Sequence, residues 1–394
     1  MSPLPSSLPL PRVLIMGPRR AGKSSISSVV LHKMSPHETL FRLDSTASPV
    51  TSTINNNALC PFAVVDFPGD WDLPSDNSPD DSLFGSGLAA LIFVLDAQDE
   101  PFDHSLARFA SLVARAVAVN PGIHVEVFIN KVDGELFLSD EAKYDCRRDV
   151  MSQVQDELAD VSASAPPSAD GGAPADLSEL NIGYYLTSIY DHSIFASFSK
   201  VVQKLIPTLP TIESLLNVLV ASCRMEKAFL FDVVSKLYIS TDSTPVDAAS
   251  VELCSDMIDV VLDVSGIYGK KDPRRKPRGD GSEAGHEGMA PRTDSAVSLN
   301  SEGDLAGGGD SSYYDSQSSS SIHLSNGMVL YLKEVDSMLA LVCLTREDNI
   351  LKKGLVDYNI SVFKDALGKV VAVNAGRGGE DKGEGGGGGE EGEA

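Results

Sequence analysis

Residues 17–24, GPRRAGKS, have the spacing of a phosphate-binding loop, GxxxxGK[ST]. The segment follows the apolar run PRVLIM and opens the helical pattern KSSISSVVLHKM. In that setting the backbone N–H groups of the loop and the helix N-terminus would bind a phosphate group. Lys23 would reach the terminal phosphates, and Ser24 would supply one ligand of Mg²⁺. The alternative is a plain strand–turn–helix corner. The predicted loop residues are Gly17, Arg19, Arg20, Ala21, Gly22, Lys23, Ser24 and Ser25.

A second motif stands at the end of the apolar run CPFAVVD, where Asp66 is followed by Gly69 in the pattern DxxG. A carboxylate at a strand end near the loop suits the ligand shell of Mg²⁺, usually through water. The Gly69 N–H can approach a terminal phosphate. Asp and Gly at a strand end are also ordinary turn chemistry, so this motif gains its meaning from the phosphate loop that precedes it.

A third motif, NKVD, directly follows the apolar run HVEVFI. Asp133 would accept hydrogen bonds from N1–H and the N2 amino group of guanine, a pairing that adenine cannot offer. Asn130 would tie loops together and meet the base edge, and the Lys131 stem would cover the base face. An Asn/Asp turn after a strand is the alternative. The residues predicted to contact the base are Asn130, Lys131, Asp133, Ser188 and Ile189, the last two through backbone that follows the run IGYYLT and meets the guanine O6.

Apolar strand patterns alternate with helical patterns through residues 11–208, which predicts an α/β domain with a mostly parallel sheet covered on both faces. Beyond them, consecutive strand patterns and one or two long helices predict a small antiparallel α+β domain over residues 211–373. The segment HLSNGMVLYL carries an Asn-Gly hairpin signal.

Four segments lack the apolar content that would offset the entropy of ordering them, and we predict disorder there. They are residues 1–10, 162–176, 270–320 and the acidic Gly/Glu tail 376–394. The run KKDPRRKPR within the third segment is either a solvated charge cluster or a signal for an anionic surface.

The net charge of −24 argues against a nucleic-acid partner, because phosphate-binding surfaces need an excess of lysine and arginine. The five cysteines are scattered without a CxxC pair, which is typical of reduced thiols in a cytosolic protein rather than a disulfide or zinc framework. No signal peptide, membrane-spanning run or lipidation motif is evident.

The motifs occur in the order that is typical of a small GTPase, and the resemblance extends further. The stretches LIMGPRRAGKSSISSVVLHKMSPHETL, VFINKVDG, YYLTSIYDHSIFASFSKVVQKLIPTLPTIESLLN and EKAFLFDVVSKLYISTDSTPVD resemble the RagC/RagD branch of the Rag GTPases. The resemblance covers nearly all of the chain outside the segments predicted to be disordered. It implies a P-loop GTPase domain followed by a roadblock-like α+β domain, and GTP or GDP with Mg²⁺ as cofactors.

The resemblance also implies partners. The roadblock-like domain would pair with that of a RagA/RagB-like GTPase to form a heterodimer. The heterodimer would bind a pentameric, roadblock-type scaffold complex on the vacuolar or lysosomal membrane and recruit the target-of-rapamycin kinase complex when amino acids are plentiful. Activating and exchange proteins would control its nucleotide state. The chain itself would be cytoplasmic and only peripherally recruited to that membrane.

At two positions the residue differs from the one that a rapidly hydrolysing small GTPase carries. Arg19 stands where efficient small GTPases carry glycine, and it would crowd the γ-phosphate. Arg19 and Arg20 could instead act as arginine fingers, or face solvent or an adjacent loop. Asp70 stands where the family carries the glutamine that orients the hydrolytic water, so we predict slow hydrolysis that depends on an activating protein. For the first switch threonine, a Mg²⁺ ligand, Thr46 is the candidate, with Thr51 and Thr53 nearby.

Two other function classes are also compatible with the sequence. A nucleotide-binding scaffold with negligible hydrolysis is favoured by Arg19 and Asp70. A P-loop kinase or ATPase is disfavoured by the NKVD motif.

Overall fold

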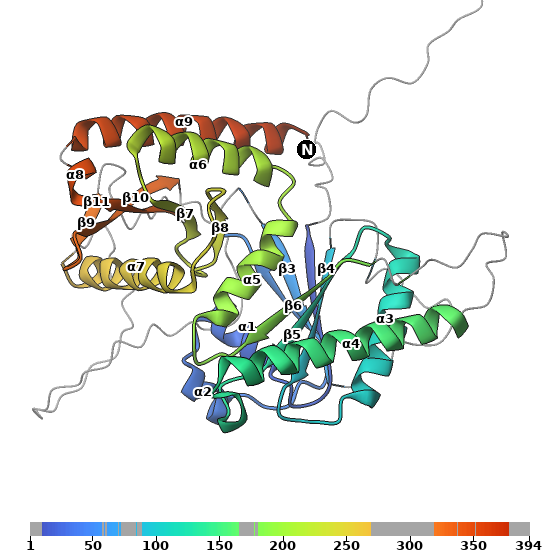
Figure 1. Ribbon diagram of the computed structural model, residues 1–394. Helices are drawn as coiled ribbons and strands as arrows, with labels where there is room; N and C mark the ends of the chain where they lie inside the picture. The colour runs from blue at the N-terminus through green and yellow to red at the C-terminus, as the bar shows by residue number, and fades with distance from the viewer. Residues whose placement is uncertain are drawn as a thin grey trace, which may run out of the picture.

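The computed structural model describes residues 10–56, 59, 61–69, 71, 84, 89–164, 177, 180–268, 319–336, 338–350 and 352–377. These residues form two sheets, each with its own helices, that lie beside one another (Figure 1).

The first sheet has six strands in the order β2-β3-β1-β4-β5-β6. All neighbouring strands run parallel except the antiparallel pair β2–β3. The strands are β1 (Arg12–Met16), β2 (Val50–Ile54), β3 (Phe62–Asp66), β4 (Ala89–Asp96), β5 (His124–Asn130) and β6 (Ile182–Thr187). The helices are α1 (Lys23–His32), α2 (Pro36–Arg42), α3 (Asp103–Val119), α4 (Asp140–Ser164) and α5 (Ser193–Lys204), with a short 3₁₀ turn η2 (Glu135–Phe137).

Alternate residues of β1 explain why this sheet is covered on both faces. Val13 and Ile15 pack into a cluster with residues of α1 and α5, whereas Leu14 and Met16 pack into a second cluster with residues of α3 and α4. A strand segment buried on both faces must be apolar, as residues 13–16 of β1 are. The prediction of an α/β domain with a mostly parallel sheet is confirmed.

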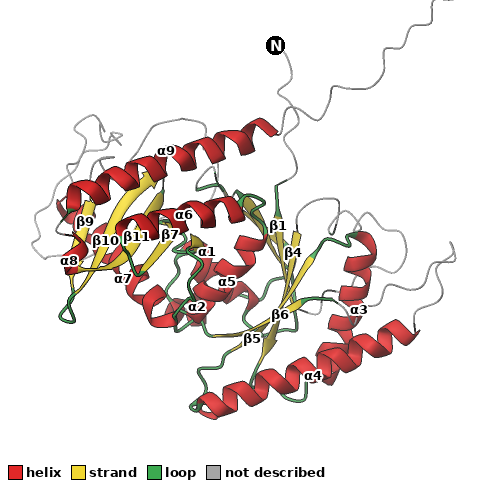
Figure 2. Cartoon of the chain, turned by 45° about the horizontal axis from the view of Figure 1, so that its top comes forward, coloured by secondary structure: helices red, strands yellow, loops and turns green. Residues whose placement is uncertain are grey.

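The second sheet has five antiparallel strands in the order β8-β7-β11-β10-β9. They are β7 (Lys227–Asp232), β8 (Tyr238–Thr241), β9 (Ser319–His323), β10 (Met328–Asp336) and β11 (Leu339–Arg346). The helices are α6 (Leu209–Cys223), α7 (Ala248–Tyr268), α8 (Glu347–Ile350) and α9 (Lys353–Arg377). Helices α6 and α9 pack together on one face, and α7 covers the other (Figures 1 and 2). The antiparallel α+β architecture is therefore confirmed as well.

The two units share one apolar cluster. It runs from β1 and α1 through Phe198 of α5 and Ile212 of α6 to Leu230 and Leu341 of the second sheet. Polar contacts cross the same boundary, because Asn56 Nδ2 donates to Asp232 Oδ2 at 3.0 Å. The units therefore meet through a packed junction.

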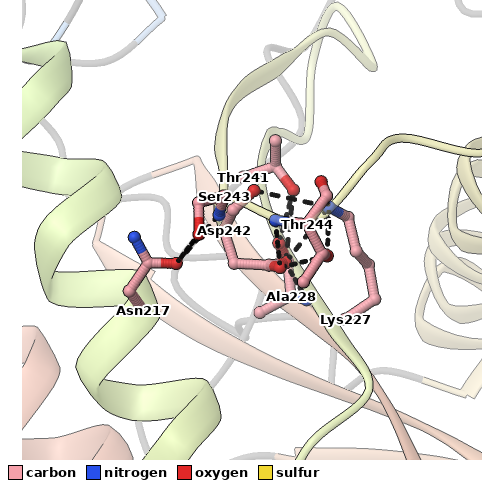
Figure 3. A network of polar contacts seen from close by, with 7 residues as sticks. All are labelled: Asn217, Lys227, Ala228, Thr241, Asp242, Ser243 and Thr244. Atoms are coloured by element: carbon pink, nitrogen blue, oxygen red, sulfur yellow. Dashed lines mark hydrogen bonds and ion pairs between the residues drawn. The ribbon is translucent and has the colours of Figure 1, made fainter.

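A buried ion pair stabilises the start of the second sheet (Figure 3). Lys227 Nζ lies 3.3 Å from Asp242 Oδ1 and donates to Thr244 O at 2.6 Å. The Asp242 carboxylate also accepts from the Ala228 N–H at 3.0 Å and from the Thr244 N–H at 3.1 Å. Burial alone would raise the pKa of Asp242, but these hydrogen bonds and the charge of Lys227 outweigh it and lower that pKa below its ordinary value.

Several ends of the predicted segments differ from the structure. Helix α4 continues to Ser164, inside the segment predicted as disordered from residue 162, and β9 already begins at Ser319. Helix α9 ends at Arg377 rather than near residue 373. The remainder of the four segments lies outside the described residues, apart from Leu10.

Among the described residues, no single helix has both the length and the apolarity of a membrane span. Helices α5 and α6 pass that test of length and composition only as a pair, which is bent by 117°.

Candidate functional site

The loop between β1 and α1 is shaped by two glycines in the left-handed region. Gly17 has φ 142° and Gly22 has φ 99°. A Cβ on Gly17 would lie 2.3 Å from the Val94 carbonyl oxygen, and one on Gly22 would lie 2.4 Å from Asn130 Nδ2. Only glycine fits at either position without rearrangement. Helix α1 begins at Lys23, so its N-terminal N–H groups face the concave side of this loop.

Lys23 is held inside the loop. Its side chain is buried, with 6% of the residue exposed, and Nζ donates to Gly17 O at 2.9 Å and to Pro18 O at 2.7 Å. These two bonds fix the Lys23 ammonium against the carbonyl groups at the start of the loop. A cation fixed there adds to the positive end of the helix. The loop is thus suited to bind a polyphosphate.

Both loop arginines are exposed, and Arg20 has φ 63°. Arg19 lies directly against Gly69, because a Cβ added to Gly69 would come within 2.4 Å of Arg19 Cγ. The start of the DxxG segment therefore rests on the outer side of the phosphate loop. The flanking residues Ala21 and Ser25 are buried and half-buried.

Two hydroxyl groups and a carboxylate meet at the end of β3. Ser24 Oγ donates to Asp66 Oδ2 at 2.6 Å and lies 2.8 Å from Thr46 Oγ1. Asp66 Oδ1 is buried without a hydrogen-bond partner. Burial raises the pKa of Asp66, although the Ser24 hydrogen bond and the Lys23 charge oppose the shift. A buried carboxylate oxygen without a partner needs an explanation, and a bound cation would supply one.

This cluster fits Mg²⁺, which prefers oxygen ligands and accepts one or two carboxylates. Thr46 is the threonine that the structure brings to the cluster. Thr51 and Thr53 are instead exposed in β2, paired with Val65 and Ala63.

The NKVD segment begins at the last residue of β5 and contacts both the phosphate loop and the end of β6. Asn130 is buried, donates from Nδ2 to Ala21 O at 2.9 Å, and accepts from Thr187 Oγ1 at 3.2 Å. It therefore joins the phosphate loop to the end of β6. The Asp133 carboxylate accepts from Ser188 Oγ at 2.6 Å. This hydrogen bond holds one oxygen of the Asp133 carboxylate against the β6–α5 loop and so fixes the orientation of the carboxylate.

Lys131 is positioned by contacts that the sequence motif did not indicate. Its φ is 67°, its Nζ lies 2.5 Å from Asp96 Oδ2, and its carbonyl accepts from Gln98 Nε2 at 2.9 Å. Asp96 is the last residue of β4 and Gln98 follows it, so only the parallel pairing of β4 with β5 brings them to Lys131. These contacts hold Lys131 against the end of β4.

The β6–α5 loop supplies a backbone donor. The Ser188 N–H already donates to Ser193 Oγ at 2.9 Å, and the Ser188 hydroxyl is taken up by Asp133. A base edge would therefore meet the N–H of Ile189. The predicted hydrolysis residue Asp70 lies outside the described residues, between Gly69 and Trp71.

Residues 12–258 match the family described as "Gtr1/RagA G protein conserved region". The chain belongs to this family. It is 47% identical over 363 residues to "Ras-related GTP-binding protein C" of Homo sapiens, covering 92% of this chain and 77% of the human protein.

The yeast relatives distinguish two branches of this Rag family. The chain is 43% identical to "GTP-binding protein gtr2" of Schizosaccharomyces pombe, over 92% of this chain and 98% of that protein. It is 25% identical to "GTP-binding protein gtr1" of the same yeast, over 61% of this chain and 70% of that protein. The chain is thus a Rag-family GTP-binding protein of the RagC/RagD type.

Proposed function

We propose that this Rag-family protein is a guanine-nucleotide switch, with slow GTP hydrolysis, that acts as a heterodimer in amino-acid signalling to the target-of-rapamycin kinase complex. The proposal that the chain binds a nucleotide rests on the contacts of Asn130. Its side-chain amide joins the phosphate loop to the end of β6, next to Ser188 and Ile189. Phosphate and base recognition are thereby built into one rigid unit.

Within that unit each residue has a separate task. The loop from Gly17 to Ser25 encloses the phosphates through its N–H groups, and Lys23 neutralises the terminal phosphates. Asp133 recognises the guanine N1–H and N2, the Ile189 N–H meets O6, and Lys131 covers the base. Ser24, Thr46 and Asp66 would hold Mg²⁺, directly or through water. The ion would supply charge neutralisation of the terminal phosphates.

The assignment of Asp133 predicts a change of base preference. We expect Asp133→Asn to lose guanosine nucleotides and to bind xanthosine nucleotides instead, because an amide can donate to the extra carbonyl of xanthine. The loss of one charge-assisted pairing is worth about 1.5–3 kcal/mol, or about 10- to 100-fold in affinity. Titration with both nucleotide types measures the change, with the exposed Asp149→Asn as control. Unchanged guanosine preference would contradict the assignment.

Slow hydrolysis follows from Asp70, whose carboxylate is shorter than glutamine and repelled by the γ-phosphate. We expect Asp70→Gln to raise the single-turnover rate of GTP cleavage by about tenfold, since a glutamine can orient the attacking water. Phosphate release from preloaded protein, with and without an activating protein, measures the rate. A wild-type rate equal to that of an activated small GTPase would contradict slow hydrolysis. Negligible release even with an activating protein would favour the alternative, a scaffold that only binds nucleotide.

The second sheet offers a surface for the heterodimer. Strand β9 is an edge strand, and edge strands present unpaired backbone groups for pairing with another chain. On α7, which covers one face of this sheet, Val260 and Val264 are half exposed. A roadblock-like domain of a RagA/RagB-like GTPase would bury both features.

Charged substitutions on α7 test whether this surface binds the partner. We expect Val260→Asp with Val264→Asp to weaken the heterodimer by at least about tenfold, because burying an unpaired carboxylate in an interface costs several kcal/mol. The control is Val218→Asp on α6, a valine that is 65% exposed on the opposite face of the sheet. Co-purification with the partner and sedimentation give the readout. Equal heterodimer yields from the two variants would rule out this surface.

The scaffold complex, the kinase complex and the peripheral position on the vacuolar or lysosomal membrane belong to the same proposal. They rest on membership of the family alone. Purification of the native heterodimer from cells, with identification of its partners and of the compartment, tests them directly. A stable, active homodimer would count against the heterodimer.

A further inference from the structure

The end of β4 and the residues directly after it hold the start of the NKVD segment in place. The Ala97 N–H donates to Asn130 O at 2.9 Å, and Gln98 Nε2 donates to Lys131 O at 2.9 Å. The Asp96 carboxylate adds an ion pair, because its Oδ2 lies 2.5 Å from Lys131 Nζ. These contacts restrain both the backbone and the side chain of Lys131.

The turn that makes these contacts, residues 96–99 (the β4 turn), is itself ordered before any ligand arrives. It is closed by a backbone hydrogen bond of 3.2 Å between its first and last residues, and Asp96 Oδ1 accepts from the Gln98 N–H at 3.0 Å. One carboxylate therefore orients Gln98 through Oδ1 and Lys131 through Oδ2. Gly134 leaves room for the amide, since a Cβ added to Gly134 would lie 2.4 Å from Gln98 Nε2.

Lys131 is the residue of the NKVD segment that needs this support. Its φ of 67° lies in the left-handed region, which costs free energy in any residue with a Cβ. Its neighbours are fixed on either side, because Asn130 is bonded to the phosphate loop and Asp133 to Ser188. A change of sign in φ at Lys131 would redirect the chain between them. The hydrogen bond from Gln98 opposes that change and so keeps Asp133 in place.

We propose that the β4 turn positions the guanine-binding segment, and that Gln98 sets how long a guanine nucleotide stays bound. Gln98 acts through the Lys131 backbone, so it is a positioning residue. Without its hydrogen bond, Lys131 would relax toward negative φ and withdraw Asp133 from the base, which speeds dissociation of the nucleotide. This inference rests on the proposed recognition of guanine by Asp133.

Dissociation of fluorescent GDP and of a non-hydrolysable GTP analogue from the full chain tests the proposal. We expect Gln98→Ala to raise both rates about threefold to tenfold, the loss that corresponds to one neutral hydrogen bond. The affinity for inorganic tripolyphosphate should stay the same, because this ligand occupies the phosphate loop and has no base. Gln155→Ala, an exposed glutamine of α4, is the matched control and should change neither property.

A second background tests whether Gln98 acts through the conformation of Lys131. Glycine adopts positive φ about as readily as negative φ. In Lys131→Gly, adding Gln98→Ala should therefore raise the GDP dissociation rate by about twofold or less, and circular dichroism checks that each variant is folded.

Three results would overturn the proposal in a chain that binds GDP. They are unchanged dissociation in Gln98→Ala, the same rise in both backgrounds, and a loss of tripolyphosphate affinity in Gln98→Ala. Absence of GDP binding in the wild type would instead refute the proposed function.

Discussion

Replacing Lys23 by alanine is expected to lower the affinity for GTP and GDP by about a hundredfold or more. The Lys23 ammonium is fixed at the mouth of the loop by Gly17 O and Pro18 O, so it meets a phosphate without further ordering. Each charge-assisted hydrogen bond that it makes to phosphate contributes about 1.5–3 kcal/mol, and a hundredfold loss corresponds to about 2.7 kcal/mol.

Titration with a fluorescent GDP analogue measures this loss, and circular dichroism checks that the variant is folded. Lys200→Ala, a lysine of α5 that lies over the Tyr185 ring, is the control and should bind normally. If Lys23→Ala bound GDP as tightly as the wild type, the phosphate loop would not be the nucleotide site.

Asp242→Ala is expected to lower the free energy of unfolding by about 3–5 kcal/mol, because it leaves the Lys227 ammonium buried without its counter-charge. The change also removes the acceptor of the Ala228 and Thr244 N–H groups. Since the pKa of Asp242 is lowered in the folded chain, its contribution is present at neutral pH and lost as the pH falls through that lowered pKa.

Urea unfolding at neutral pH measures the effect. The comparison is Asp247→Ala, an exposed aspartate that accepts from the Ser250 N–H at 3.2 Å at the start of α7 and should cost about 1 kcal/mol. Adding Lys227→Met to Asp242→Ala should recover part of the loss, because the charge is removed with its partner. A loss of less than about 1 kcal/mol in Asp242→Ala would show that the pair is not a main support of the second sheet.

The sequence predicted the parts of the site that have a local pattern. The phosphate loop, Asp66 and NKVD each follow a buried strand, and parallel strands bring their carboxyl ends to one edge of the sheet. Their proximity was therefore predictable without coordinates. Thr46 was already the candidate from the family resemblance, but its contact with Ser24 could not be derived from the local patterns, which did not reveal β2.

Contacts between distant segments could not be predicted either. The clamp of Lys131 by Asp96 and Gln98 depends on strand pairing, and the bond between Asn56 and Asp232 depends on how the two units pack. Helix α4 was also missed, although its buried residues recur every four positions, because they stand singly among charged and polar neighbours. Local patterns predicted the elements and the order of the motifs, whereas long-range packing determined the polar partners.

The central claim is that this chain binds guanine nucleotides in the loop at residues 17–24. The most direct measurement is competition for a labelled GTP analogue bound to the purified chain with Mg²⁺. The account predicts that GTP and GDP displace the label, whereas ATP at a thousandfold excess does not. Displacement by ATP at the same concentration as GTP, or no binding of the label at all, would contradict it.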